Sequence, residues 1–147
     1  MEEDYGRGRV DLAAARSTRG MKMIWAGQIM SGLVALFLLV DSVVKVMRLP
    51  VAVEGTTQLG YPEHVVVGIG IVQLVCLVVY LIPRSAIFGA ILLTGYLGGA
   101  VATHVRVGTP LFSHVLFPIY VAVLVWGGVF GRFPRLRAFI PVQRSEP

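Results

Sequence analysis

Charged residues are scarce in this sequence. Only 14% of its 147 residues are charged and 56% are hydrophobic, whereas an ordinary soluble domain has about 25% charged and about 45–50% apolar residues. The mean hydropathy of +0.77 leaves too little polar surface to face water on all sides. The composition therefore argues against a soluble enzyme, a disordered chain and a nucleic-acid-binding module, and it favours a small integral membrane protein.

Cysteine is nearly absent as well. Cys76 is the only one, and it lies inside an apolar run. A single thiol forms no intramolecular disulfide, and there is no Cys-x-x-Cys pair, which excludes thioredoxin-like and membrane disulfide-exchange chemistry. We expect Cys76 to be a small buried apolar residue.

Other signatures of chemistry are also missing. The sequence has no nucleotide-binding loop, no Ser/His/Asp arrangement and no pair of glycosidase carboxylates. A metal would need ligands from three separate spans, Asp41, His104 and His114, because no two histidines share a helix face at ligand spacing. We therefore expect no metal site and see no cofactor motif.

Four long apolar runs are what the sequence does contain. A membrane-spanning helix needs about 20 residues, and the runs cover residues 23–47, 65–82, 85–105 and 111–130. They are nearly continuous, unlike the alternating strands of a membrane β-barrel. We predict an all-α membrane protein, a four-transmembrane-helix bundle whose membrane domain covers residues 23–131.

The segments outside these runs are polar. Residues 1–22 are predicted to form a flexible tail because their glycines disfavour regular structure, and residues 132–147 form a basic tail. In the loop at 48–64, the sequence leaves open whether residues 53–59 add half a turn or re-enter the membrane interface.

The basic residues predict the orientation. Ten of the thirteen Lys and Arg residues lie in the two tails or in the Pro83-Arg84 turn. Under the positive-inside rule, both termini are expected in the cytoplasm, with the chain crossing the inner (plasma) membrane.

Small residues line two faces of the third run. Gly95, Gly99 and Thr103 follow one another at intervals of four, and Gly98 lies on a second such stripe. Because small residues let helices approach closely in lipid, we predict helix packing through these four residues. The alternative is a cavity beside the glycines that admits a flat ring or a lipid tail.

Ionisable residues inside the spans are costly and few. Asp41 and Lys45 are four residues apart, so they share one face of the first helix and can neutralise each other. The direction of the spans brings further polar groups to the same outer mouth. We predict a ligand-binding site there from Asp41, Lys45, Gln73, His104, Arg106 and His114. A purely structural ion pair of Asp41 with Lys45 or Arg106, and a plain interhelical hydrogen bond for Gln73, stay open.

The third run carries a resemblance to a known family. Residues 93–106, followed by Pro-Leu-Phe-Ser-His at 110–114, resemble the DoxX-like family of small bacterial membrane proteins, as do the first span and Gly60-Tyr61-Pro62. The resemblance covers about residues 23–140 and implies a four-helix membrane bundle. The family's naming member is the small subunit of a thiosulfate:quinone oxidoreductase, and other relatives accompany redox enzymes.

Three functions follow as expectations. The first is a non-catalytic membrane component that binds a quinone-like or lipid-like ligand, or a partner redox enzyme, at its outer face. The second is a membrane subunit of an oxidoreductase of the thiosulfate:quinone type. The third is a small proton-coupled transporter with a relay through Asp41, Gln73 and His104. Without paired cysteines or a cofactor motif, we do not expect the isolated chain to be an enzyme. We expect the lipid bilayer as a partner and no nucleic acid.

Overall fold

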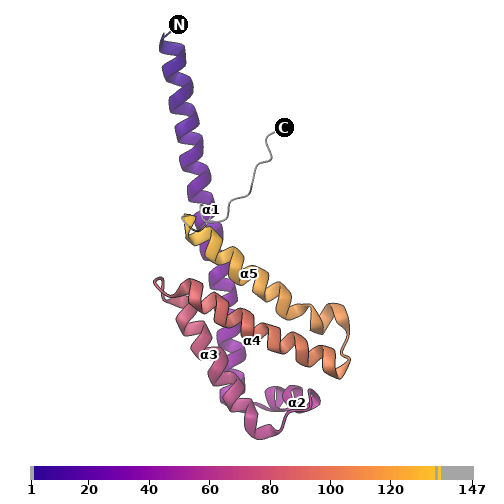
Figure 1. The fold of residues 1–147 in the computed structure, drawn as a ribbon. Helices are drawn as coiled ribbons and strands as arrows, with labels where there is room; N and C mark the ends of the chain where they lie inside the picture. The colour runs from indigo at the N-terminus through magenta and orange to yellow at the C-terminus, as the bar shows by residue number, and fades with distance from the viewer. Residues whose placement is uncertain (1, 135, 137–147) are drawn as a thin grey trace.

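The structure is a computed structural model that describes residues 2–134 and 136, and only the backbone of residues 2–17 and 19. These residues form five α-helices and, within the described part, no β-strand (Figure 1). The helices are α1 (Glu2–Val46), α2 (Pro50–Gln58), α3 (Val66–Leu81), α4 (Ala86–Val107) and α5 (Phe117–Arg132). A 3-10 turn, η1 (Glu63–Val65), precedes α3, and a π-helical turn, η2 (Leu111–Val115), precedes α5. The predicted all-α fold is confirmed.

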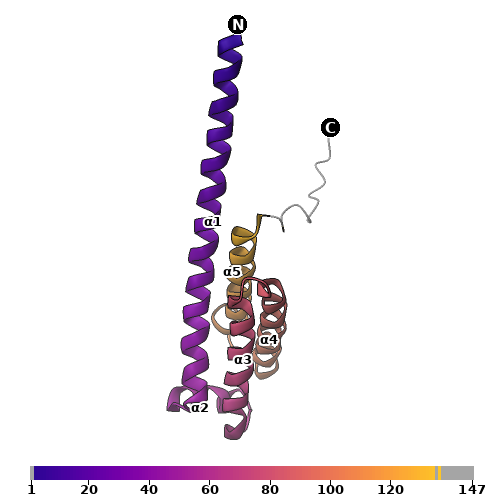
Figure 2. The ribbon, with the colours of Figure 1, turned by 90° about the vertical axis from the view of Figure 1, so that its left-hand side faces the viewer.

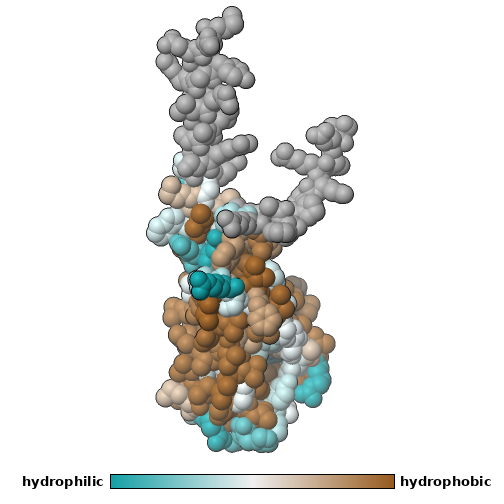
Figure 3. Space-filling view, turned by 60° about the vertical axis from the view of Figure 1, so that its left-hand side comes forward, coloured by the Kyte–Doolittle hydropathy of each residue, from teal (hydrophilic) through white to brown (hydrophobic). Residues whose placement is uncertain are grey.

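Four helical segments are long and apolar enough to cross a membrane. They are Gly20–Val46, Glu63–Leu81, Ala86–Val107 and Leu111–Arg132, within a few residues of the predicted spans. Their outward surfaces carry many exposed large hydrophobic side chains, which form a continuous brown belt in Figure 3, with hydrophilic residues gathered at the end near α2. Such a surface suits lipid and not water, so the chain is a multi-pass membrane protein.

The four spans form a ring. Helix α1 packs against α3 and α5, and α4 packs against the same two helices from the other side (Figures 1 and 2). Helices α1 and α4 lie opposite each other, and their backbones do not approach closely in the part of the chain that is described. The centre is filled by buried side chains from all four, among them Leu38, Leu77, Tyr80, Leu93 and Val125.

The first helix is longer than its span. It begins at Glu2, so the segment predicted as an irregular tail is helical here and projects beyond the bundle (Figure 1). Leu12 and the three alanines after it are strong helix formers, and extending an existing helix avoids the cost of nucleation. These effects outweigh the glycines. Of the predicted basic tail, residues 135 and 137–147 lie outside the described residues.

The segment predicted as a loop at 48–64 contains a helix, α2. The sequence alone left the structure of this segment open. Arg48 has a positive φ of 53° and Pro50 occupies the first turn of α2, so the chain reverses just after α1. Helix α2 lies across the end of the bundle, as Figures 1 and 2 show. It therefore covers the opening between α1 and α4 at this end of the bundle.

The fourth span is interrupted near Pro118. This proline lies in the first turn of α5, where its missing N–H leaves no helical bond unmade. The π-helical turn before it is closed by the bond from Leu116 N to Leu111 O, at 2.9 Å. His114 lies on this turn, which packs against α4.

Candidate functional site

Gln73 joins three helices at the centre of the predicted site. Its Oε1 accepts hydrogen bonds from Lys45 Nζ at 3.0 Å and from Tyr96 Oη at 2.7 Å. Its Nε2 donates to Asp41 Oδ2 at 2.7 Å and to the carbonyl of Leu38 at 3.3 Å. A side-chain amide has two acceptor positions and two N–H groups, so every hydrogen-bonding position is used. Gln73 is completely buried, and this network fixes its orientation.

Asp41 and Lys45 form the ion pair that their spacing predicts. Lys45 Nζ contacts Asp41 Oδ2, the same oxygen that accepts from Gln73. The Lys45 side chain is 18% exposed and that of Asp41 is 37% exposed. The ammonium has three N–H groups and two bind Asp41 and Gln73. The third has no partner in the described chain, so Lys45 retains a donor for another molecule.

Tyr61 and Arg106 close the site from the loop side. Thr103 Oγ1 donates to the carbonyl of Gly99 at 2.9 Å, so Tyr61 Oη, 2.9 Å from Thr103 Oγ1, is the donor in that contact. Arg106 Nη2 donates to the carbonyl of Leu59 at 2.9 Å, and its guanidinium carbon lies 5.9 Å from the centre of the Tyr61 ring. These bonds attach the loop after α2 to the end of α4.

The hydrogen bonds of His104 define its tautomer. Thr109 Oγ1 donates to the backbone carbonyl of His104 at 3.2 Å, so its one proton is used. His104 Nδ1 lies 3.1 Å from the same Oγ1 and must therefore carry the proton of that contact. In the neutral ring, Nε2 is then an acceptor. The His114 ring stands edge-on to it with centroids 5.8 Å apart.

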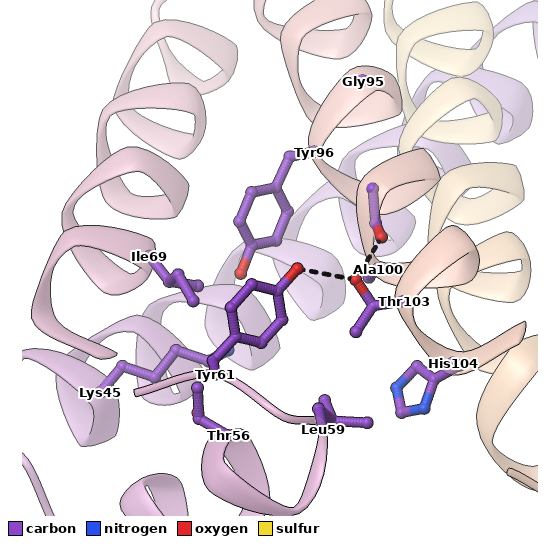
Figure 4. A pocket seen from close by; sticks show the side chains of 11 residues that line it. Lys45, Thr56, Leu59, Tyr61, Ile69, Gly95, Tyr96, Ala100, Thr103 and His104 are labelled. Carbon is purple, nitrogen blue, oxygen red and sulfur yellow. Dashed lines mark hydrogen bonds between the residues drawn. The ribbon is translucent and has the colours of Figure 1, made fainter. Parts of the chain in front are cut away.

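Two adjoining cavities meet at these residues. The first has a volume of about 380 Å³ and is shown in Figure 4, where Lys45, Tyr61, Tyr96 and His104 surround it. Its wall on α4 is made of Gly95, Gly99, Ala100 and Thr103. The second, about 510 Å³, lies between α1, α2 and the start of the fourth span and is lined by Asp41, His104 and His114 among others. Lys45, Thr56, Leu59 and His104 line both.

Three of the four glycines of α4 face open space. A β-carbon on Gly95, Gly98 or Gly99 would meet no atom within 4 Å, so the close helix packing predicted through them is not seen within the described chain. Two of them, Gly95 and Gly99, line the first cavity, as the alternative interpretation expected. Close approach occurs elsewhere, where Gly27 of α1 meets Gly131 of α5 and where Gly89 of α4 meets the backbone at Tyr80.

The predicted site residues come together, although not in one cluster. Asp41, Lys45 and Gln73 form the bonded network, and His104 and His114 lie across the two cavities from it. Arg106 contributes to neither cavity lining and instead binds the loop. Asp41 and the two histidines form no metal-binding group, since no three such side chains cluster in the residues described.

Sequence reasoning missed the two tyrosines. Tyr96 completes the bonding of Gln73, and Tyr61 covers the first cavity and binds Thr103. In an apolar run or at a helix end, a tyrosine is usually read as a core or interface residue. The one available signal was that both lie in the segments that carry the family resemblance.

Comparison with known proteins identifies the family. The sequence pattern of the DoxX-like family matches residues 29–128 of the chain. The chain belongs to the DoxX-like family. No curated protein and no solved structure matches it. The match runs from α1 to α5 and so includes every residue of this DoxX-like site.

Proposed function

We propose that this DoxX-like protein binds the ring of a quinone-like molecule in the first cavity, as a membrane component without catalytic activity of its own. The observation that carries the proposal is the cavity of about 380 Å³ between Lys45, Tyr61, Tyr96 and the side-chain-free wall at Gly95 and Gly99. Ligand pockets are typically about 300–1,000 Å³ and mostly apolar, with a few placed polar groups. A single ring suits a cavity at the lower end of that range.

The polar groups around the cavity suit the two oxygens of such a ring. Lys45 offers an N–H to a carbonyl oxygen, and neutral His104 offers Nε2 to the hydroxyl of the reduced form. The protons of Tyr61 and Tyr96 already bind Thr103 and Gln73, which leaves their rings as flat apolar walls. This division between polar ends and flat walls favours a quinone-like ring over a lipid headgroup.

The expected orientation of the chain decides on which face of the membrane the cavity opens. Lys45 is the last basic residue of α1, and the cavity lies at the end of the bundle covered by α2, away from the tails. With both termini in the cytoplasm, as the positive-inside rule predicts, this is the outer face of the plasma membrane. We propose that a partner redox enzyme meets the chain there.

The test is extraction of the purified protein. The chain is purified in detergent, extracted with organic solvent and analysed for quinone by liquid chromatography. We expect quinone in a ratio near one per chain, and a loss of at least tenfold in Gly99→Leu, whose new side chain fills the cavity. Gly98→Leu is the matched control, because Gly98 lies one residue away, faces open space and does not line the cavity.

Two outcomes would overturn the proposal. One is wild-type protein that carries no more quinone than the detergent extract of the membrane. The other is an equal quinone content in the Gly99→Leu and Gly98→Leu proteins. Quinone reduction by the purified chain alone would overturn the non-catalytic part.

A further inference from the structure

The end of the bundle opposite α2 carries Arg132, which has no anionic partner among the described side chains. Arg132 is the last residue of α5, and its Nε and Nη2 are buried and donate to no acceptor in the described chain. Its guanidinium carbon lies 4.9 Å from the centre of the Tyr80 ring and 5.6 Å from that of Phe133. Ring faces attract a cation but supply no negative charge. No hydrogen bond or ion pair from this guanidinium to another described side chain satisfies its charge.

A rigid base holds this guanidinium. Tyr80 is completely buried, and its hydroxyl donates to the carbonyl of Val125 at 3.1 Å. Because that uses the phenol's single proton, Ser31 Oγ, 2.9 Å away, must be the donor in its own contact with Tyr80. The ring beneath Arg132 is thus fixed to α1 and α5 by hydrogen bonds.

A groove opens beside Arg132. Its volume is about 450 Å³, and it runs between α1, the end of α3 and the end of α5. The lining is mostly apolar, with one amide and one hydroxyl, and consists of Ile24, Gln28, Ser31, Gly32, Leu81, Pro83, Arg132 and Phe133. A groove of this kind accepts a hydrocarbon chain along its wall and a polar group at Arg132.

The charged side chains that the structure describes at this end of the bundle are all basic. Among the side chains that the structure describes, Lys22, Arg84 and Arg132 lie here, whereas Asp41, Glu54 and Glu63 all lie toward the α2 end (Figure 1). Arg132 and Leu81 are also the last residues of their spans. That position corresponds to the level of the lipid headgroups, because a span is about as long as the hydrocarbon core is thick.

We propose that this groove binds an anionic phospholipid, with the phosphate on Arg132. The planar guanidinium is suited to phosphate oxygens, and basic pockets between transmembrane helices recognise lipid headgroups. The acyl chain then lies along Ile24 and Leu81. This site is at the opposite end from the quinone cavity and does not depend on it.

The experiment measures thermal unfolding of the purified full-length protein in a neutral detergent. Phosphatidylglycerol, phosphatidylcholine and inorganic phosphate are added in separate arms. We expect phosphatidylglycerol to raise the unfolding temperature by several degrees, and the other two to raise it much less. In Arg132→Gln the shift from phosphatidylglycerol is lost. Arg84→Gln removes the same charge from an exposed turn at the same end and keeps the shift.

A second pair of variants leaves the charge in place. Gly32→Phe fills the groove, since a β-carbon on Gly32 meets nothing within 4 Å, and it should abolish the shift. Gly68→Phe, on an equally open glycine of α3 outside the groove, should not. An equal loss in the Arg132→Gln and Arg84→Gln proteins, an equal shift from inorganic phosphate, or a full shift in Gly32→Phe would each overturn the proposal.

Discussion

Gly27 of α1 and Gly131 of α5 lie so close together that neither has room for a side chain. A β-carbon on either glycine would overlap the backbone of the other. This contact joins the first and last spans and closes the ring of helices. These two glycines are needed for packing, whereas other glycines of the bundle are not.

We predict that Gly131→Ala lowers the free energy of unfolding by about 1–3 kcal/mol, the usual cost of overpacking. The measurement is unfolding in mixed micelles of increasing SDS content, followed by circular dichroism. Gly98→Ala is the control, because its β-carbon enters open space, and alanine favours a helix by about 1 kcal/mol over glycine. The contact is unimportant if both variants unfold at the same SDS fraction.

Replacing Gln73 should destabilise the bundle at the end near α2. Gln73→Leu leaves Lys45 and Tyr96 without their shared acceptor, and each unmatched buried group costs about 1–3 kcal/mol. The same SDS titration measures the loss. Ser42→Ala is a fair comparison, since Ser42 is equally buried but bonds only within its own helix, so its loss should be smaller. A Gln73→Leu protein as stable as wild type would contradict the network's role.

The Asp41–Lys45 pair should be coupled in a double-mutant cycle. Asp41→Asn leaves the Lys45 charge unmatched, and adding Lys45→Met removes that cost, so the double variant should be more stable than the single effects predict. With the Asp41 side chain 37% exposed, we expect a coupling of only about 1 kcal/mol. Additive effects would mean that the two side chains do not interact energetically.

The orientation can be measured in whole cells. Cys76 is the sole cysteine and is buried, so Cys76→Ala gives a clean background for single reporters. In that background, Glu63→Cys should react with a membrane-impermeant maleimide from outside, whereas Arg84→Cys should react only after the membrane is opened. The reverse labelling pattern would invert the assignment and place the proposed quinone site on the cytoplasmic side.

The spans and the ion pair could be predicted because their causes are local. An apolar run of sufficient length has few alternatives to a transmembrane helix, and a spacing of four places Asp41 beside Lys45. The bonding of Gln73 to Tyr96 depends instead on how α3 meets α4. No pattern within either helix contains that information.

The glycines show the same limit. Pairs of small residues four positions apart occur at Gly95–Gly99, at Gly27–Ser31 and at Gly127–Gly131. The last two contribute to the close contact between α1 and α5, and the first faces a cavity. Spacing identifies a helix face that permits close approach, but the neighbour on that face is decided by the topology of the ring.

That ring also sets an order for biogenesis. Helices α3 and α4 are joined by a short turn and pack together, so they can associate as soon as both have entered the bilayer. Helix α1 is made first, yet one of the two spans that it packs against is α5, the last span to be synthesised. We therefore expect the face of α1 at Gly27 to stay in contact with lipid until translation has passed Gly131, and a chain that stops earlier to lack the helix that covers this face.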